Sequence, residues 1–232
     1  MRIGIIGALD VEVQALKELM DEPVIEKISS VDFYIGKIHG VDTVVATAGM
    51  GKVNAAVCAQ TMILTYHTTH VINIGIAGGL TNELGIFDIA VAVNVVEHDM
   101  DASDIGDEPG FITGIDKIYM ECDDMLIDIM YKAALSIGGI KVLKGTIASG
   151  DQFISTNEQR ERIVSSFGAI AAEMEGASIG HVCTMNSVPF GVLRTISDSA
   201  DSDSGVDYPT FKKAAAEHSI RIVCEMLKSL SK

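Results

Sequence analysis

The chain has 232 residues, with 17 Lys and Arg against 32 Asp and Glu, a formal net charge of −15, and 48% hydrophobic residues. This length and apolar content suffice for one sizeable core, so we expect a single domain over residues 1–232. The excess of carboxylates repels polyanions, which argues against nucleic acid as a partner.

The sequence indicates a cytoplasmic protein without membrane contact. Its apolar runs are shorter than the roughly 20 residues that span a bilayer, and the N-terminal MRIGIIGALDVEV lacks the features of a signal peptide. The cysteines Cys58, Cys122, Cys183 and Cys224 form no CxxC pair, so neither a disulfide framework nor a zinc site is indicated. We interpret Cys58, Cys183 and Cys224, which lie in apolar helical stretches, as reduced core residues.

Predicted strands and helices alternate along the chain. Runs rich in β-branched residues predict strands over 2–7, 31–38, 41–48, 71–78, 87–98, 141–149, 168–174 and 189–197. Apolar residues at helical spacing predict helices over 11–20, 53–66, 125–137, 176–185 and 211–230. This alternation is typical of a layered α/β domain with a mixed, largely parallel central sheet.

Two connections depart from this pattern. His39 and Gly40 separate two predicted strands and suit a tight antiparallel hairpin. The stretch 99–110 is polar, contains Gly and Pro, and has no period, which predicts an irregular loop of the kind that often carries function.

Acidic residues follow several predicted strands, where an open α/β sheet places its ligand crevice. Glu12 lies two residues into the first predicted helix, Glu173 and Glu175 flank Met174 between a strand and a helix, and Asp198 ends a buried strand. A carboxylate that accepts two hydrogen bonds matches the vicinal hydroxyls of a ribose, and only one of two carboxylates at i and i+2 can face a given site. The alternative is that these residues are helix-terminus charges or turn formers, with Asp10 capping the first helix.

Other polar and aromatic positions are harder to interpret. Arg194 lies inside an apolar strand, where an unpaired guanidinium is costly to bury. Phe153 follows a turn at Gly150, and its ring is suited either to stack on a planar base or to pack in the core. The glycine-rich GIAGGL at 75–80 lacks the spacing of a dinucleotide fingerprint and the lysine of a P-loop, so no cofactor is expected.

His98, Asp99 and Asp101 cluster in the segment HDMD, and these residue types are able to bind a metal ion. Their single-turn spacing and the absence of a second His nearby favour a loop-stabilising role over metal binding. We therefore expect no metal.

The motifs together, in their order, are specific. They are GIIGALDVEV near the N-terminus, GMGKVNAA at 49–56, NIGIAGGL at 73–80, HDMD at 98–101, ASGDQFI at 148–154, AAEMEGASIGHVC at 171–183 and VLRTISDSAD at 192–201. Over essentially the whole chain they resemble the methylthioadenosine/S-adenosylhomocysteine nucleosidases of the nucleoside phosphorylase superfamily. The resemblance implies a three-layer α/β/α sandwich and a homodimer in which the loop 99–110 of each subunit completes the partner's active site. It also implies hydrolysis of the N-glycosidic bond of 5′-methylthioadenosine and S-adenosylhomocysteine, with release of adenine and the 5-thioribose product, in methionine salvage and methyl-cycle recycling.

The resemblance also implies roles for individual residues. Glu12 would orient and deprotonate the attacking water with help from Arg194, Glu175 would bind the ribose diol, and Asp198 would protonate N7 of the departing adenine. The remaining substrate-binding positions are Glu173, Met174 against the ribose, Phe153 stacked on adenine, the Ile154 backbone at the base edge, Ile76, Gly78, Ser197 and Tyr208, with Ala102, Ile105 and Pro109 facing the 5′-substituent pocket of the partner. Many family members have Ser in place of Ile76 and Phe in place of Tyr208.

Three other functions compete with this one. A purine nucleoside phosphorylase of the same superfamily would use phosphate, which needs cationic donors, whereas the resemblance puts Glu12 and Ile76 at the nucleophile site. Hydrolysis of 6-amino-6-deoxyfutalosine is a second activity of related sequences, which the sequence does not separate from the first. A non-enzymatic nucleoside-binding protein would tolerate the loss of Glu12 or Asp198, yet the matched acidic positions are filled.

Overall fold

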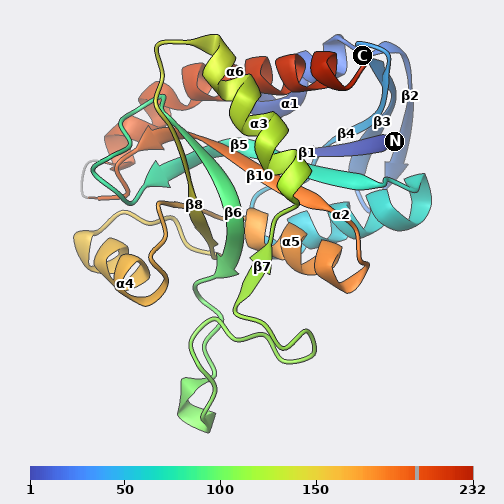
Figure 1. Cartoon of the computed structure of the whole chain (residues 1–232). Coiled ribbons are helices and arrows are strands. Elements are labelled where there is room, and N and C mark those ends of the chain that lie inside the picture. Colours follow the sequence, from blue (N-terminus) through green and yellow to red (C-terminus); the bar gives the residue numbers. More distant parts are fainter. Residues whose placement is uncertain (202–203, 232) are drawn as a thin grey trace.

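The computed structural model describes residues 1–201 and 204–231 (Figure 1). The strands are β1 Arg2–Gly7, β2 Asp21–Ile28, β3 Val31–Ile38, β4 Val41–Thr47, β5 His70–Gly79, β6 Ile89–Glu97, β7 Tyr119–Glu121, β8 Val142–Ser149, β9 Ala171–Glu173 and β10 Phe190–Asp198. The helices are α1 Asp10–Glu18, α2 Lys52–Tyr66, α3 Asp124–Ile137, α4 Asn157–Phe167, α5 Gly176–Met185 and α6 Ser204–Leu230, with a 3-10 turn η1 at Ser103–Ile105.

The strands form one mixed sheet, within the described residues, that closes on itself at one end. The strand order is β10-β6-β8-β9-β5-β1-β4-β3-β2, β7 pairs with β6, and β5 also pairs with β10. The longest ladders, β5 with β10 and β6 with β8, are parallel. Because β1 and β10 both run parallel to β5, their carboxyl ends meet at the same edge.

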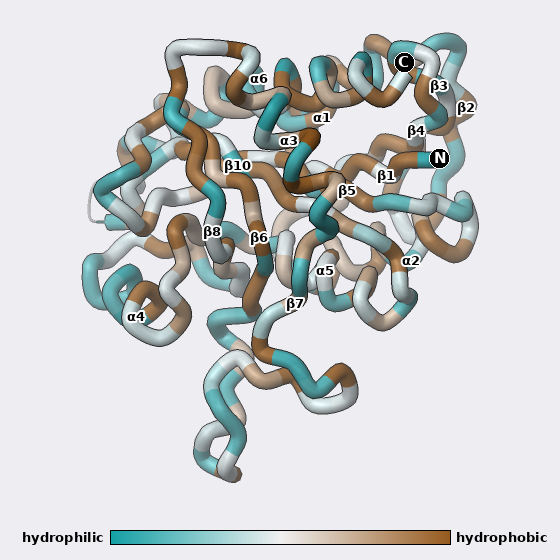
Figure 2. The backbone as a smooth tube through the Cα atoms, viewed as in Figure 1, coloured by the Kyte–Doolittle hydropathy of each residue, from teal (hydrophilic) through white to brown (hydrophobic). Residues whose placement is uncertain are grey.

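Apolar strands at the centre of the sheet form the core, and helices cover it. The tube in Figure 2 is most hydrophobic along β1, β5, β6 and β10, which lie between the helices. Helix α6 packs on α1 and α3, while α2 packs on α5. The helices therefore form two outer layers around the sheet, as expected for an α/β/α sandwich.

Most predicted helices and strands are confirmed, and so is the predicted hairpin at His39 and Gly40. His39 and Gly40 have φ values of 50° and 82°, and strands β3 and β4 pair from Ile38 opposite Val41. Positive φ at both turn residues gives the twist that a two-residue hairpin needs. Strands β2 and β7 and helix α4 were not predicted.

The segment between β6 and β7 extends away from the rest of the molecule (Figure 1). It contains η1, and Ile105 at the end of η1 is 85% exposed. The irregular loop predicted for 99–110 is thus confirmed.

Two further sequence expectations concern cysteines and membranes. All cysteines are free; Cys58, Cys122 and Cys183 are buried and Cys224 is partly buried. Across residues 1–201 and 204–231, no helix combines the length and apolar composition that a membrane span requires.

Candidate active site

A pocket opens at the carboxyl ends of β1, β5 and β10, next to β9. It is lined by Ala8, Leu9, Glu12, Met50, Ile76, Ala77, Gly78, Phe153, Ala172, Glu173, Met174, Glu175, Ser197, Asp198 and Tyr208. A smaller hollow that shares several of these residues adds Ile154. The structure thus brings together the predicted site residues of the four strand ends, with Arg194 adjoining them.

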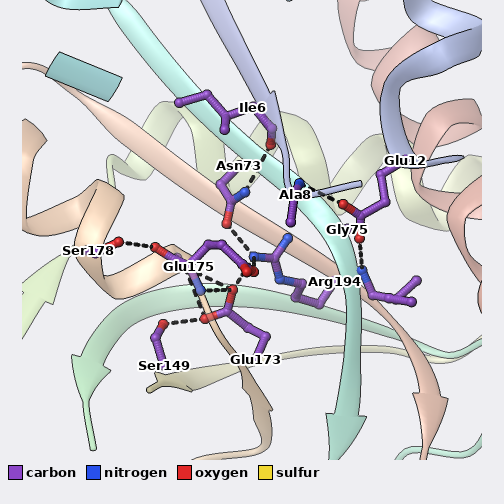
Figure 3. A network of polar contacts seen from close by, with 12 residues as sticks. Ile6, Ala8, Glu12, Asn73, Gly75, Ser149, Glu173, Glu175, Ser178 and Arg194 are labelled. Atoms are coloured by element: carbon purple, nitrogen blue, oxygen red, sulfur yellow. Dashed lines mark hydrogen bonds and ion pairs between the residues drawn. The ribbon is translucent and has the colours of Figure 1, made fainter. Parts of the chain in front are cut away.

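Glu12 is held in one orientation by backbone N–H groups (Figure 3). Its Oε2 accepts hydrogen bonds from the N–H of Ala8 at 2.7 Å and of Leu9 at 2.9 Å, and its Oε1 accepts one from Ile76 at 3.2 Å. Burial raises the pKa of this carboxyl, against the opposing charge of Arg194 and these hydrogen bonds. A buried carboxylate with a raised pKa is suited to accept a proton from water.

A close approach at Gly75 lets Glu12 and Arg194 enter the site together. A Cβ atom at Gly75 would lie 2.5 Å from Glu12 Oε1 and 2.6 Å from Arg194 Nη1. Only a residue without a side chain leaves both groups in place.

The alternative that Asp10 caps α1 is wrong. The N-cap is Leu9, and Asp10 is the first residue of the helix. The Asp10 carboxylate instead accepts hydrogen bonds from Lys17 Nζ at 3.0 Å and Thr47 Oγ1 at 2.6 Å. These partners lower the pKa of Asp10, with the Thr47 hydrogen bond as the main cause.

Arg194 is the buried cation of the site, with 1% of its surface exposed. Its Nη2 donates to Asn73 Oδ1 and to Glu173 Oε2, and lies 3.6 Å from Glu175 Oε2 (Figure 3). Asn73 is fixed in turn, because its Nδ2 donates to the carbonyl of Ile6 at 2.9 Å. The guanidinium therefore has the charged partners that its burial requires.

Glu173 and Glu175 have different environments. The Glu173 carboxylate accepts from Ser149 Oγ, from the N–H of Gly176 at 2.8 Å and from the N–H of Glu175 at 3.1 Å, in addition to Arg194. Its oxygens are thus occupied in holding the turn that precedes α5.

Glu175 Oε1 accepts one hydrogen bond, from the N–H of Gly51 at 2.9 Å. Burial and the neighbouring charge of Glu173 raise the pKa of Glu175 to about 7. Glu175 is therefore the carboxylate with capacity for a ligand, and Glu173 supports it.

Asp198 is the last residue of β10 and is buried. Its Oδ2 accepts from Ser197 Oγ at 2.9 Å, and its Oδ1 accepts from the N–H of Ala200 at 2.9 Å. A Cβ atom at Gly78 would lie 2.9 Å from Asp198 Oδ1, so the glycine leaves room for this carboxylate. Asp198 thus forms the predicted turn and also lines the pocket.

Two aromatic rings border the opening of the pocket. The side chain of Phe153 is 44% exposed, so the alternative of core packing is wrong. Its ring meets that of Tyr208 edge to face, with centroids 5.5 Å apart. Ile76 is buried in a small apolar cluster with Ala215 and Ala216, and Tyr208 packs against this cluster, which makes one wall of the pocket apolar.

Some predicted residues lie elsewhere, and others were missed. Ala102, Ile105 and Pro109 belong to the projecting loop and do not line the pocket of their own chain. Met50, which is 55% exposed, lines the pocket although the sequence assigned it no role. The one feature of the sequence that could have indicated Met50 is its position within the motif GMGKVNAA.

The HDMD segment stabilises loops. Asp99 Oδ2 accepts from the N–H of Asp151 at 2.8 Å, and Asp101 Oδ1 accepts from that of Ser103 at 2.9 Å. Among residues 1–201 and 204–231, no group of three or more His, Cys, Asp or Glu side chains is placed to hold a metal ion.

The fold and its carboxylate pocket agree with a family model described as "Phosphorylase superfamily", which matches residues 2–228. Within this superfamily the chain belongs to the 5′-methylthioadenosine/S-adenosylhomocysteine nucleosidases. It is 38% identical over 231 residues to the nucleosidase of that name from Shewanella halifaxensis, with 99% of this chain and 100% of the relative covered.

Solved structures agree with this membership. The 5′-methylthioadenosine/S-adenosylhomocysteine nucleosidase from Neisseria meningitidis, in complex with methylthio-immucillin-A, superposes with a TM-score of 0.95 at 33% identity, over 98% of this chain and 99% of that one. Futalosine hydrolase of Helicobacter pylori gives a TM-score of 0.94 at 34% identity, over 99% and 98%.

Proposed function

We propose that the protein hydrolyses the N-glycosidic bond of 5′-methylthioadenosine and S-adenosylhomocysteine, releasing adenine and the 5-thioribose product. The observation that carries the proposal is the convergence of three buried carboxylates, Glu12, Glu175 and Asp198, in one pocket, each held by different hydrogen-bond donors. The membership of the chain in this nucleosidase family supports the same reaction.

The reaction places different demands on the three carboxylates. As the bond from C1′ to N9 breaks, its electron pair passes to adenine, and the sugar becomes oxocarbenium-like. Asp198 supplies the proton that neutralises N7 of the leaving base. Glu12 takes a proton from the water whose oxygen bonds to C1′, and Glu175 accepts hydrogen bonds from the ribose diol, so that negative charge faces the cationic sugar.

The remaining predicted residues provide shape. Phe153 stacks on the adenine ring, Met174 lies against the ribose, and the backbone of Ile154 meets the base edge, with Ser197 supporting Asp198. Ile76 and Tyr208 form the wall near the water and the 5′ side. No cofactor or metal takes part in this proposal.

Water rather than phosphate is the nucleophile in this proposal. The lining contains four carboxylates, Glu12, Glu173, Glu175 and Asp198, and among its described residues neither Lys nor Arg. The nearby guanidinium of Arg194 is already engaged by Glu173. A phosphate dianion would meet repulsion without the cationic donors that bind it in phosphorylases.

A second substrate, 6-amino-6-deoxyfutalosine, is favoured by the similarity to the futalosine hydrolase of Helicobacter pylori. This nucleoside carries the same adenine and ribose and differs at the 5′ position. The groups proposed for base and diol recognition, Asp198 and Glu175, therefore serve it equally.

We also propose a cytoplasmic homodimer in which residues 1–232 of each subunit act as one domain. The projecting loop 99–110, with Ala102, Ile105 and Pro109, would complete the partner's pocket on its 5′ side. Two observations support this assembly: Ile105 is 85% exposed, and Met50 beside the pocket leaves 55% of its surface exposed. A second subunit would cover both.

The proposal is tested by incubating the purified protein with methylthioadenosine, S-adenosylhomocysteine, aminodeoxyfutalosine, adenosine and inosine, and following the free base. Adenine release from the first two, without added phosphate, is the expected result. Asp128→Asn alters an exposed carboxylate outside the pocket, and this variant is expected to release adenine at the rate of the wild type. Absence of base from every nucleoside would refute the enzyme proposal.

A further inference from the structure

A second polar network, outside the pocket lining, surrounds Lys52 at the start of α2. Lys52 Nζ donates to Glu97 Oε2 at 3.0 Å and to Asp99 Oδ1 at 2.7 Å, and its backbone N–H donates to Asp151 Oδ1 at 2.8 Å. His181 Nδ1 lies 3.1 Å from Glu97 Oε1. We call these five residues the Lys52 network.

The Lys52 network joins segments that are far apart in the sequence. Glu97 ends β6, Asp99 begins the projecting loop, Asp151 lies two residues before Phe153, and His181 lies in α5. The N–H of Asp151 also donates to Asp99 Oδ2 at 2.8 Å, which closes the network between two loops. The Lys52 ammonium thus joins Glu97 to Asp99 directly, whereas Asp151 is joined through the backbone N–H of Lys52 and His181 through Glu97.

The network connects to the pocket through Gly51. The N–H of Gly51, next to Lys52 in the chain, donates to Glu175 Oε1 at 2.9 Å. Gly51 has φ 94°, and a Cβ atom there would lie 2.9 Å from Asp151 Oδ1. The position of this N–H therefore depends on the contact of the α2 N-terminus with Asp151, and that contact is held from the other side by Lys52 Nζ through Asp99.

Charge and burial make Lys52 important to this geometry. The side chains of Lys52, Glu97 and Asp99 are 19%, 10% and 15% exposed, so their charges are largely removed from water. Although burial disfavours its charge, the hydrogen bonds to Asp99 and Glu97 hold the pKa of Lys52 above its usual value. Without the ammonium, Glu97 and Asp99 would repel each other, with His181 as the remaining basic group of the network.

We propose that Lys52 is a positioning residue for hydrolysis: it holds the α2 N-terminus against Asp99 and Glu97, so that the Gly51 N–H orients Glu175 toward the ribose diol. This inference rests on the proposed function. Lys52 touches neither the substrate nor the reacting atoms, and it acts through Gly51 and Glu175.

The test compares Lys52→Met with wild type on methylthioadenosine and on its 3′-deoxy analogue, which lacks one hydroxyl of the diol. Loss of one hydrogen bond to a charged group corresponds to a fall in kcat/KM of about 10- to 100-fold on methylthioadenosine. On the 3′-deoxy analogue we expect a smaller fall in kcat/KM. The ratio of kcat/KM between methylthioadenosine and the analogue therefore decreases in Lys52→Met. Lys52→Arg keeps the positive charge and restores part of the discrimination.

Two further variants separate positioning from general damage. Combining Lys52→Met with Glu175→Gln is expected to cost little more than Glu175→Gln alone, because both changes remove the same interaction. Lys144→Met removes a lysine that is paired with Asp128 on the surface and serves as the control with unchanged kinetics. If Lys52→Met does not fold, Asp99→Asn takes its place. It removes the ion pair between Lys52 and Asp99 while keeping the shape of the side chain, and it is also expected to decrease the ratio of kcat/KM between the two substrates.

The outcomes are distinct. Wild-type kcat/KM in Lys52→Met, or an equal loss on both substrates, would overturn the inference while leaving the proposed function intact. Full additivity with Glu175→Gln would overturn it as well. Wild-type protein that releases no adenine would overturn the proposed function and the inference with it.

Discussion

We predict that Glu175 makes the affinity of the protein for nucleosides depend on pH near neutrality. Burial and the charge of Glu173 raise the pKa of its carboxyl to about 7, whereas the N–H of Gly51 and the charge of Arg194 act in the opposite direction. In its proposed role as ligand of the ribose diol, the ionised carboxylate would accept hydrogen bonds from both ribose hydroxyls, and the protonated form would lose part of this capacity. We therefore expect nucleoside binding to favour the ionised form and to release a proton.

The sign and size of the effect follow from this pKa. We expect the affinity to fall as the pH falls below this pKa of about 7, because protons compete with the diol for the carboxylate. Each pH unit corresponds to about tenfold in affinity until the protonated form binds on its own. We expect binding about tenfold weaker at about pH 6 than at about pH 8, where it levels off.

The assay is calorimetric titration with a methylthioadenosine analogue that has carbon in place of N9, so that no turnover occurs. Titrations in buffers of different ionisation enthalpy count the protons released on binding. Glu175→Gln has no titrating carboxyl at this position and is expected to bind weakly with a flatter pH profile. Affinity that stays constant over this range, or that increases toward acid, would show that ionised Glu175 does not bind the diol.

Three other variants test the site. Glu12→Gln is expected to lower kcat by about 100- to 10,000-fold, because it removes the proposed general base, while analogue binding measured by calorimetry stays near wild type. Asp198→Asn should likewise bind analogues and lose most of its turnover with adenine as leaving group; near-normal turnover would exclude Asp198 as the acid. Arg194→Met leaves Glu173 buried without its cation, and we expect a loss of about 3–5 kcal/mol in the free energy of unfolding, measured by denaturant titration. An unchanged midpoint in Arg194→Met would show that Glu173 does not depend on the guanidinium.

The helices and strands that the sequence predicted are those whose buried apolar residues recur at a regular spacing. Strand β2, DEPVIEKI, was missed because it is mostly exposed and contains Pro23. Helix α4 was missed because only Ile163 and Phe167 of its residues are buried, which leaves little apolar period. Strand β7 has three residues, too few for any period to show.

The sequence indicated most of the residues that line the pocket, but it did not indicate which of them contact one another. The spacing of Glu173 and Glu175 indicated that one of them faces a ligand, but it did not say which one. That choice depends on Ser149 and Arg194, which reach Glu173 from other strands. Lys52 lies in the motif GMGKVNAA, but its partners Glu97 and Asp99 lie 45 and 47 positions further along the chain, so the motif does not indicate them.

The decisive measurement for hydrolysis by the carboxylate pocket is the identity of the products formed from methylthioadenosine with and without inorganic phosphate. Adenine and free methylthioribose, formed at the same rate in both conditions, are the predicted result. A phosphorylated sugar, or adenine release that requires phosphate, would contradict it.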